Sequence, residues 1–242
     1  MTYRVAEKFK SLQGEGVYAG TPMAFIRFVG CSVGKKICQH CDTDFDNTMP
    51  WRGGGEFTAE ELHSWSRPYG HICLTGGEPL DQDLEPLFSQ LLNWHDPDGT
   101  GYHVDPPMVH IETSGTRMLE NPNGAWSTLK TWLCVSPKPG WLRGMIELAD
   151  EVKVIVPGLG TTESLLALTK NDGHPLAQME RFRWPDLDDA LQWAVEGKTV
   201  FLQPRNGKYD VDKMNLLYVT DLLRDHPSLR LSAQLHKILK VQ

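Results

Sequence analysis

Short runs of apolar and β-branched residues recur along the chain, and most of them end at Gly, Pro or Ser. Runs bounded in this way predict buried β-strands. Between them lie segments whose apolar side chains repeat every three or four residues, which is typical of amphipathic helices. We therefore expect strands over residues 24–30, 72–75, 109–113, 133–136, 151–156 and 200–203, and helices that start at Thr58 or cover 84–94, 187–195 and 210–225.

The alternation of strands and helices predicts an α/β fold with a mainly parallel sheet. Residues 3–10 are expected to add an edge strand, and residues 229–235 the last strand. The core strands end in Gly-rich or polar turns, so the active site is expected at their C-terminal ends. Residues 95–107 and 120–127 are turn-rich loops. Without a repeat or a clear linker, a single domain over residues 1–242 is expected.

The composition is that of a soluble globular protein, with 40% hydrophobic and 23% charged residues in 242. No apolar stretch is long enough for a transmembrane helix, and the polar first ten residues do not form a secretory signal. The net charge is −7 and the chain has no run of Lys or Arg, which argues against a nucleic-acid partner. We expect a cytoplasmic protein with no membrane partner.

Three of the five cysteines lie within eleven residues, directly after the expected strand 24–30. An odd number of cysteines without a sign of secretion argues against a disulfide framework. Cys73 and Cys134 lie inside apolar strand segments, where we expect them to serve as buried packing residues. The other three, Cys31, Cys38 and Cys41, form the pattern C-x6-C-x2-C.

Three thiolates on one loop can hold three corners of an iron–sulfur cluster and leave one iron open. A structural zinc site normally takes four ligands, and His40, between two of the cysteines, is poorly placed to be the fourth. Two alternatives stay open. The cysteines cluster without a metal, or His40 or a distant His completes a zinc site.

The cysteine triad resembles the cluster loop of the radical S-adenosylmethionine (SAM) superfamily, whose usual spacing is C-x3-C-x2-C. This chain departs from it with six residues in the first gap. A second motif, TGGEP at residues 75–79, follows an expected strand and resembles the superfamily's GGE motif, whose backbone faces the amino group of SAM. Glycine permits such a close approach of a ligand. The two motifs in this order, each after a strand, favour the superfamily.

The whole chain resembles the 7-carboxy-7-deazaguanine synthase family. QGEG followed by a cysteine triad also occurs in related activating enzymes, whereas SPK and the C-terminal motif favour the synthase. The matching motifs are SLQGEG at 11–16, CDT at 41–43, ETSGT at 112–116, SPK at 136–138, QP at 203–204 and QLHK at 234–237.

The resemblance implies an incomplete radical-SAM barrel, similar to a TIM barrel, with about six core parallel strands and fewer helices than a full barrel. It implies a lyase that converts 6-carboxy-5,6,7,8-tetrahydropterin to 7-carboxy-7-deazaguanine with loss of ammonia, a step of queuosine and 7-deazapurine biosynthesis. The implied cofactors are a [4Fe–4S] cluster, SAM and Mg²⁺. The implied partners are the small pterin substrate, an electron donor such as a flavodoxin or ferredoxin, and a second copy of the chain in a homodimer.

Residue roles follow from the resemblance alone, position by position. Arg27 pairs with a substrate carboxylate, and Gln13 offers a donor and an acceptor to a pterin edge. No acid or base is assigned, and Glu112 has no role. The implied metal ligands are Cys31, Cys38, Cys41 and, for Mg²⁺, Thr43. The implied SAM contacts are His40, Cys41, Asp42, Gly77, Ser136, Pro137, Lys138, Gln203, Pro204, Arg205 and Asn206. The implied substrate contacts are Ser11, Leu12, Gln13, Glu15, Arg27, Thr75, His236 and, through its terminal carboxylate, Gln242.

Two other functions stay possible at this point. One is a radical-SAM activase that makes a glycyl radical on a partner protein, which requires a protein-docking face rather than a closed pocket. The other is a zinc-stabilised binding module without catalysis.

Overall fold

The computed structural model describes residues 1–38, 41, 43–93, 105–119, 124–157 and 183–240. These residues form one nine-stranded sheet in the order β3-β1-β2-β4-β5-β6-β7-β8-β9. Neighbouring strands from β2 to β9 are parallel, whereas β1 is antiparallel to both β2 and β3. The strands are β1 (Thr2–Leu12), β2 (Pro22–Phe28), β3 (Gly55–Thr58), β4 (His71–Gly76), β5 (Met108–Thr113), β6 (Thr131–Val135), β7 (Glu151–Val156), β8 (Thr199–Pro204) and β9 (Arg230–Leu231).

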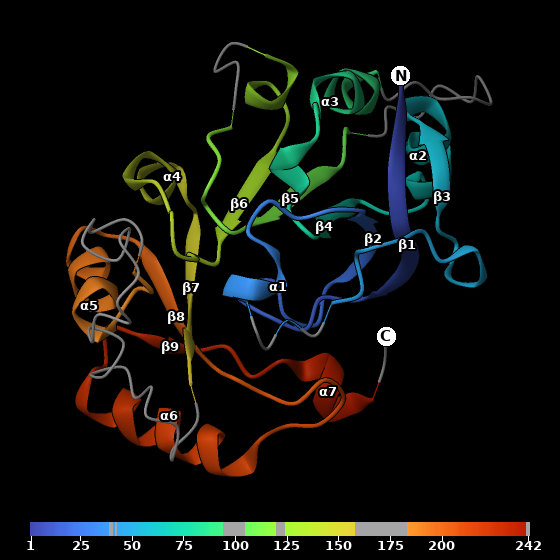
Figure 1. The fold of residues 1–242 in the computed structure, drawn as a ribbon. Helices are drawn as coiled ribbons and strands as arrows, with labels where there is room; N and C mark the ends of the chain where they lie inside the picture. Colours follow the sequence, from blue (N-terminus) through green and yellow to red (C-terminus); the bar gives the residue numbers. More distant parts are fainter. Residues whose placement is uncertain (39–40, 42, 94–104, 120–123, 158–182, 241–242) are drawn as a thin grey trace.

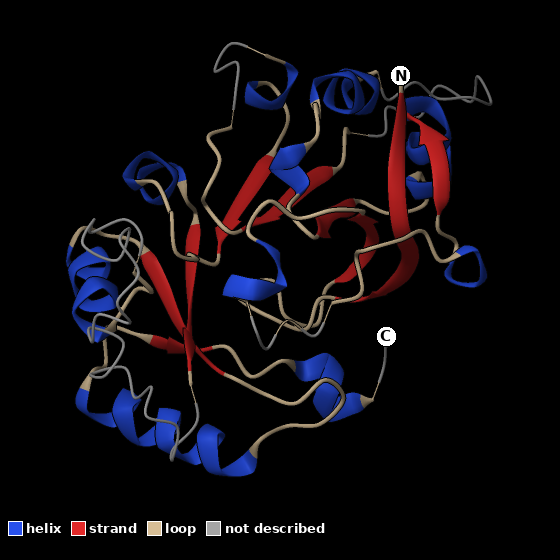
Figure 2. Cartoon of the chain, in the orientation of Figure 1, coloured by secondary structure: helices blue, strands red, loops and turns tan. Residues whose placement is uncertain are grey.

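The sheet is curved, and in Figure 1 its strands surround the short helix α1, while α2 to α6 lie on the outer side. Figure 2 shows that helices follow most of the parallel strands, as in an α/β barrel that is not closed. No helix of the described residues is long and apolar enough to cross a membrane. The helices are α1 (Gly34–Ile37), α2 (Ala59–Ser66), α3 (Glu85–Leu92), α4 (Arg143–Leu148), α5 (Leu187–Val195), α6 (Lys213–Asp225) and α7 (Leu235–Leu239), with short 3-10 helices at Pro50–Arg52, Pro79–Asp81 and Ala125–Ser127.

The six expected core strands are confirmed as β2 and β4 to β8, but both ends of the sheet differ from expectation. Residues 3–10 belong to β1, which is not an edge strand, because β3 pairs with it on the other side. Strand β3 has no apolar run that would predict it, and it forms by pairing with β1. The expected strand 229–235 is wrong in extent, since only Arg230–Leu231 pair with β8. The chain then turns at Gln234, which has a φ of 52°, and α7 begins at Leu235.

The expected helix starts depend on caps that the structure supplies. Thr58 caps α2 in a capping box with Glu61, as expected from the sequence. Asp212 caps α6, so this helix begins at Lys213 and not at residue 210. The helix expected over 84–94 is shorter and spans Glu85–Leu92. Of the two expected loops, residues 105–107 and 124–127 lie within the described part of the chain.

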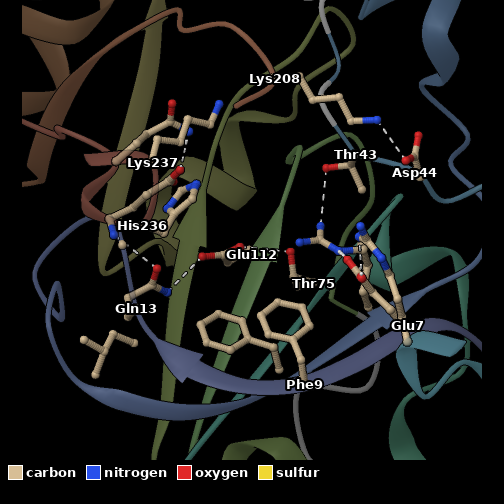
Figure 3. A pocket seen from close by; sticks show the side chains of 18 of the residues that line it. Glu7, Phe9, Gln13, Thr43, Asp44, Thr75, Glu112, Lys208, His236 and Lys237 are labelled. Atoms are coloured by element: carbon tan, nitrogen blue, oxygen red, sulfur yellow. Dashed lines mark hydrogen bonds and ion pairs between the residues drawn. The ribbon is translucent and has the colours of Figure 1, made fainter. Parts of the chain in front are cut away.

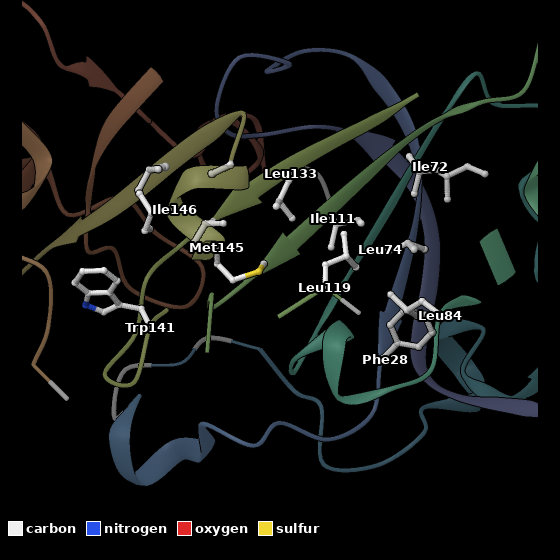
Figure 4. Close-up of a cluster of buried hydrophobic side chains, with 14 of the residues drawn as sticks. Phe28, Ile72, Leu74, Leu84, Ile111, Leu119, Leu133, Trp141, Met145 and Ile146 are labelled. Atoms are coloured by element: carbon white, nitrogen blue, oxygen red, sulfur yellow. The ribbon is translucent and has the colours of Figure 1, made fainter. Parts of the chain in front are cut away.

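Side chains along the core strands alternate between the two faces of the curved sheet. On the outer face, residues such as Ile72 and Leu74 of β4 join Ile111 of β5 in one buried cluster with the helices (Figure 4). Each such side chain contributes about 1.5–3 kcal/mol through burial. The intervening residues belong to the inner face, where Cys73 packs with Met23 and Phe25 in a second, smaller cluster. Cys73 and Cys134 are buried, as expected.

Candidate active site

A polar pocket of about 290 Å³ lies at the inner face of the sheet, near the C-terminal ends of β2, β4 and β5. In Figure 3, Gln13 and His236 lie at one end of it, and Thr43, Asp44 and Lys208 at the other. The pocket joins the loop after β1 to the C-terminal helix, although these segments are more than 200 residues apart in the sequence. Its lining residues are Glu7, Phe9, Leu12, Gln13, Gly14, Glu15, Phe25, Arg27, Thr43, Asp44, Arg52, Thr75, Gly76, Glu112, Lys208, Tyr209, Gln234, His236 and Lys237.

The two glycines of the QGEG motif make room for residues from distant parts of the chain. A Cβ at Gly14 would lie 2.1 Å from Nδ1 of His236, and a Cβ at Gly16 would lie 2.1 Å from Oε1 of Glu151. Gly16 also has a φ of 67°, which other residues rarely adopt. The N–H of Leu235 donates to the carbonyl of Gly14 at 2.8 Å. The motif is therefore the docking site for the start of α7.

A buried group of charges lies beneath this loop. Nζ of Lys153 is 2.5 Å from Oε2 of Glu15 and 3.7 Å from Oε1 of Glu112. Burial raises the pKa of Glu15, but the Lys153 ammonium outweighs this and lowers the pKa to about 2. Burial lowers the pKa of Lys153, but Cys134 and the carboxylates of Glu15, Glu112 and Glu151 raise it well above its ordinary value. Glu15 and Lys153 are therefore both held in their ionised forms.

Glu112, which the sequence left without a role, connects the predicted substrate residues. Its Oε1 accepts a hydrogen bond from Nε2 of Gln13 at 3.0 Å, and its Oε2 accepts one from the hydroxyl of Thr75 at 2.9 Å. Oε1 of Gln13 accepts from the N–H of Glu15 at 3.2 Å. One carboxylate thus orients a pocket amide from the loop after β1 and a pocket hydroxyl from β4.

Glu7 organises the other end of the pocket. Its Oε1 accepts from Nε of Arg27 at 2.9 Å, and its Oε2 accepts from Nη1 of Arg52 at 3.1 Å. Nη1 of Arg27 donates to the hydroxyl of Thr43 at 3.3 Å, so the expected carboxylate-binding and magnesium-binding residues are neighbours. The guanidinium of Arg27 lies 6.0 Å from the centre of the Phe9 ring.

The three cysteines of the triad share one neighbourhood. Burial raises the pKa of the Cys38 thiol to about 11, Lys138 opposes this rise, and the thiols of Cys41 and Cys31 add to it. In the described part of the chain, no three His, Cys, Asp or Glu side chains converge on a single metal-ion position. A [4Fe–4S] cluster does not need such convergence, because each cysteine binds a different iron. Three thiolates that each bind a different iron are the donor set that a [4Fe–4S] cluster takes.

The GGE turn packs directly on the loop that carries the first cysteine. A Cβ at Gly77 would lie 1.7 Å from the carbonyl oxygen of Gly30, and the N–H of Glu78 donates to that same carbonyl at 3.0 Å. A Cβ at Gly76 would lie 2.4 Å from the backbone nitrogen of Phe28. The glycines are thus required by a backbone-to-backbone contact, in addition to any contact with a ligand.

Hydrogen bonds connect the GGE turn to the ETSGT and SPK elements. The buried carboxylate of Glu78 accepts from the hydroxyl of Thr113 at 2.7 Å and from the N–H of Ser114 at 2.8 Å. Nζ of Lys138 donates to the carbonyl and the hydroxyl of Ser136 at 2.8 and 2.7 Å. The N–H of Lys138 donates to the carbonyl of Ser114 at 3.1 Å. The loops after β4, β5 and β6 thereby form one connected rim beside the cysteine loop.

The structure brings many, but not all, of the predicted site residues together. The residues at the end of β8 contact the QGEG loop and the C-terminal motif. Gln203 donates to Glu15 at 3.3 Å, and Asn206 donates to Gln234 at 2.7 Å. Ser11 is not among the lining residues. His40, Asp42 and Gln242 lie outside the described residues. Those that line the pocket are Leu12, Gln13, Glu15, Arg27, Thr43, Thr75 and His236.

Several lining residues have no signal in the sequence that marks them. Glu7 and Phe9 lie in a strand that the sequence only places at the N-terminus. Arg52, at the end of a 3-10 helix, and Lys208, in a loop, are isolated basic residues. Gln234 is an exception, since it belongs to the C-terminal motif, and its Nε2 donates to Glu15 at 2.7 Å. Only the folded chain shows that these side chains face one cavity.

A comparison with protein-family models finds no match. Curated relatives match over nearly the whole chain, and each is named 7-carboxy-7-deazaguanine synthase. The protein of Caulobacter vibrioides is 34% identical over 254 residues, 99% of each chain. That of Bradyrhizobium diazoefficiens is 31% identical over 258 residues, and that of Burkholderia multivorans 29% identical over 257 residues, both covering 100% of each chain.

Among solved structures, the crystal structure of QueE from Escherichia coli matches with a TM-score of 0.60 and 27% identity. The match covers 96% of this chain and 93% of that one. The fold is thus the expected partial radical-SAM barrel. Full-length similarity at 31–34% identity, together with a pocket built from the motifs of both chain ends, shows that the chain belongs to the 7-carboxy-7-deazaguanine synthase family.

Proposed function

We propose that the protein is a radical-SAM lyase that converts 6-carboxy-5,6,7,8-tetrahydropterin to 7-carboxy-7-deazaguanine with loss of ammonia, a step of queuosine and 7-deazapurine biosynthesis. One observation carries the proposal: the QGEG loop, Arg27, Thr43, Thr75 and the start of α7 line the same small polar pocket. Membership of the family makes radical-SAM cofactors the expected chemistry. The chain acts as a single domain over residues 1–242 in this proposal.

The cofactors would be a [4Fe–4S] cluster, SAM and Mg²⁺; the first two would supply radical chemistry, and Mg²⁺ would supply a positive charge for the substrate carboxylate. We assign the cluster to Cys31, Cys38 and Cys41. The rim residues Gly77, Ser136 and Lys138 would contact SAM, as would His40, Asp42 and the stretch Gln203 to Asn206. Thr43 would contribute its hydroxyl to Mg²⁺, a cation that prefers oxygen ligands.

The chain's own residues would bind and orient the pterin. Arg27 would pair with its carboxylate in a charge-assisted hydrogen bond. Gln13 would face the pterin ring, held by the hydrogen bond from its Nε2 to Glu112. His236 would contact the substrate from α7, which docks on Gly14. The hydrogen bonds and ion pairs among the pocket's charged side chains keep these groups preorganised.

The C-terminal carboxylate remains part of the proposal. Gln242 is carried over from the family as a substrate contact, and a carboxylate accepts two hydrogen bonds from the adjacent amino and ring N–H groups of a pterin. A C-terminal tag should therefore raise the apparent Michaelis constant for the pterin and leave the iron content unchanged. Unchanged kinetics of the tagged protein would remove Gln242 from the substrate site.

The other candidate functions have less support. An activase needs a docking face for a protein, whereas a small pocket lined by hydrogen-bonding groups suits a small molecule. A zinc module needs ligands that converge on one ion, and the described residues hold no such group. A flavodoxin or ferredoxin as the electron donor and a homodimer as the working form are carried over from the family as parts of the proposal.

Anaerobic turnover tests the function. The reconstituted protein is incubated with SAM, a reductant, Mg²⁺ and 6-carboxytetrahydropterin, and 7-carboxy-7-deazaguanine is expected as the product. A cluster-replete protein that yields no deazaguanine would refute the proposal, and a colourless protein with one zinc and no iron would indicate the binding module. As a test of the magnesium site, Thr43→Val should weaken the stimulation by Mg²⁺ while cluster content and SAM binding persist.

A further inference from the structure

A β-bulge in β1, next to Glu7, explains how the side chain of Glu7 reaches the pocket. The pairing of β1 with β2 shifts register between Val5 and Glu7. Bulges bend a strand and redirect a side chain, and they are frequent next to active sites. Here the bulge leaves the carbonyl of Ala6 available to accept a hydrogen bond from the N–H of Met49 at 2.8 Å. The segment that follows Met49 is therefore anchored to β1 at the bulge.

This anchored segment carries Arg52 at the end of the 3-10 helix Pro50–Arg52. Gly53 ends that helix with a φ of 73°, and a Cβ at Gly54 would lie 2.1 Å from the carbonyl oxygen of Ala6. The turn is thus fixed tightly against the backbone of β1. Arg52 therefore donates a hydrogen bond to Oε2 of Glu7, while Arg27 donates one to Oε1.

The side chains at the Glu7 end of the pocket carry a net positive charge, which an anionic ligand would neutralise. Glu7 alone would neutralise Arg27, so a carboxylate that approached this pair would meet no net charge. Arg27 and Arg52 both pair with Glu7, and Lys208 pairs separately with Asp44, so these five side chains carry 3 − 2 = +1. Arg52 supplies that excess charge, and it also acts on Asp44, whose pKa the Lys208 ammonium chiefly lowers.

Exposure distinguishes Arg52 from a residue that only holds the fold together. Its side chain is 46% exposed and lines the pocket, whereas the Glu7 carboxylate beneath it is 8% exposed. Only its Nη1 donates to Glu7. A guanidinium has five N–H donors in a planar fork, so Arg52 keeps donors for a ligand while Glu7 orients it.

We propose that Arg52 is a second guanidinium for recognition of the substrate carboxylate, held beside Arg27 by Glu7, and so determines specificity for a carboxylated pterin. This inference rests on the proposed function. Arg27 binds the carboxylate next to Thr43, and Arg52 makes the site electropositive. A pterin without the carboxylate gains nothing from Arg52.

Equilibrium binding tests the inference without turnover. The full-length, cluster-reconstituted protein is titrated anaerobically, without reductant and in a magnesium buffer, with 6-carboxypterin and with pterin, which lacks the carboxylate. In Arg52→Gln we expect the Kd for 6-carboxypterin to rise about threefold to tenfold and the Kd for pterin to stay unchanged, as for a half-exposed charge-assisted contact. Arg52→Lys should recover part of the loss. Arg224→Gln, which removes an exposed guanidinium from α6, is the matched control and should bind both ligands normally.

If Arg52→Gln raised the Kd of both pterins equally, or left the Kd of 6-carboxypterin unchanged, the role of Arg52 would be overturned and the proposed function would stand. Wild-type protein that binds neither pterin would refute the proposed function, and this inference with it. Higher ionic strength should weaken binding of 6-carboxypterin to the wild type more than to Arg52→Gln, because screening acts on the charge that this substitution removes. Equal salt dependence would also count against the proposal.

Discussion

Removal of the Lys153 ammonium should destabilise the protein strongly. With an effective dielectric constant of about 20, the attraction is about 6.5 kcal/mol to Glu15 at 2.5 Å and about 4.5 kcal/mol to Glu112 at 3.7 Å. The cost of burying these ions offsets much of that gain. Lys153→Met keeps the length of the side chain but leaves buried carboxylates without their cation. We therefore expect it to lower the free energy of unfolding by about 3–5 kcal/mol at pH 7.

Urea unfolding of the cluster-free protein, followed by circular dichroism, measures this change. Lys130→Met is the matched control, because Lys130 is 66% exposed and forms only a 3.8 Å pair with Asp105, so a loss of at most about 0.5 kcal/mol is expected. A loss below about 1 kcal/mol in Lys153→Met would refute the reasoning, since it would mean that the carboxylates do not depend on this ammonium.

The pH dependence of the same measurement gives a second check. The pKa of Glu15 is about 2 in the folded wild type, below its ordinary value of 4.5. The pair therefore stabilises the protein above pH 4.5, and the contribution is lost as the pH falls from 4.5 toward 2. Without Lys153, burial raises the pKa of Glu15, so the carboxyl becomes protonated more easily. The difference between wild type and Lys153→Met should thus be largest near neutral pH and shrink toward pH 4.5, and a constant difference would contradict this account.

Two further substitutions test the loops of the site. Gly14→Ala places a Cβ 2.1 Å from His236, so it should displace the imidazole, weaken pterin binding and lower the free energy of unfolding by about 1–3 kcal/mol. In the control Gly70→Ala the Cβ would meet nothing within 4 Å, so pterin binding and the free energy of unfolding should stay nearly unchanged. Cys38→Ala should abolish iron binding and SAM cleavage, while the buried Cys73→Ala should keep its iron; equal iron loss in both would contradict the assignment of the triad.

Local patterns in the sequence were sufficient for the repeating part of the fold. Apolar runs that end in turn residues predicted β2 and β4 to β8, since a buried strand must carry apolar side chains toward the helices. The capping box at Thr58 set the start of α2 for the same local reason. The strands at the two ends of the sheet could not be predicted correctly from such local patterns. Strands β3 and β9 form because they pair with β1 and β8, rather than from a pattern in their own residues.

The motifs, taken with the resemblance to a known family, pointed to the residues of the pocket but not to what holds them. The sequence named Gln13, Thr75 and Arg27, yet the carboxylates that orient them, Glu112 and Glu7, had no role until the strands were placed side by side. Contacts of this kind join residues far apart in the chain, and no spacing rule encodes them.

By itself, the sequence determined the α/β class, the six core strands and the chemistry-bearing motifs, because period, turn residues and clustered cysteines are local properties. Only the tertiary structure decided that His236 packs against Gly14, that Lys153 forms an ion pair with Glu15, and that a bulge in β1 places Arg52 beside the pocket. The physical reason is that a buried charge or a close backbone approach is defined by its partners, and those partners come together only when the sheet curves and the loop after β1 meets α7.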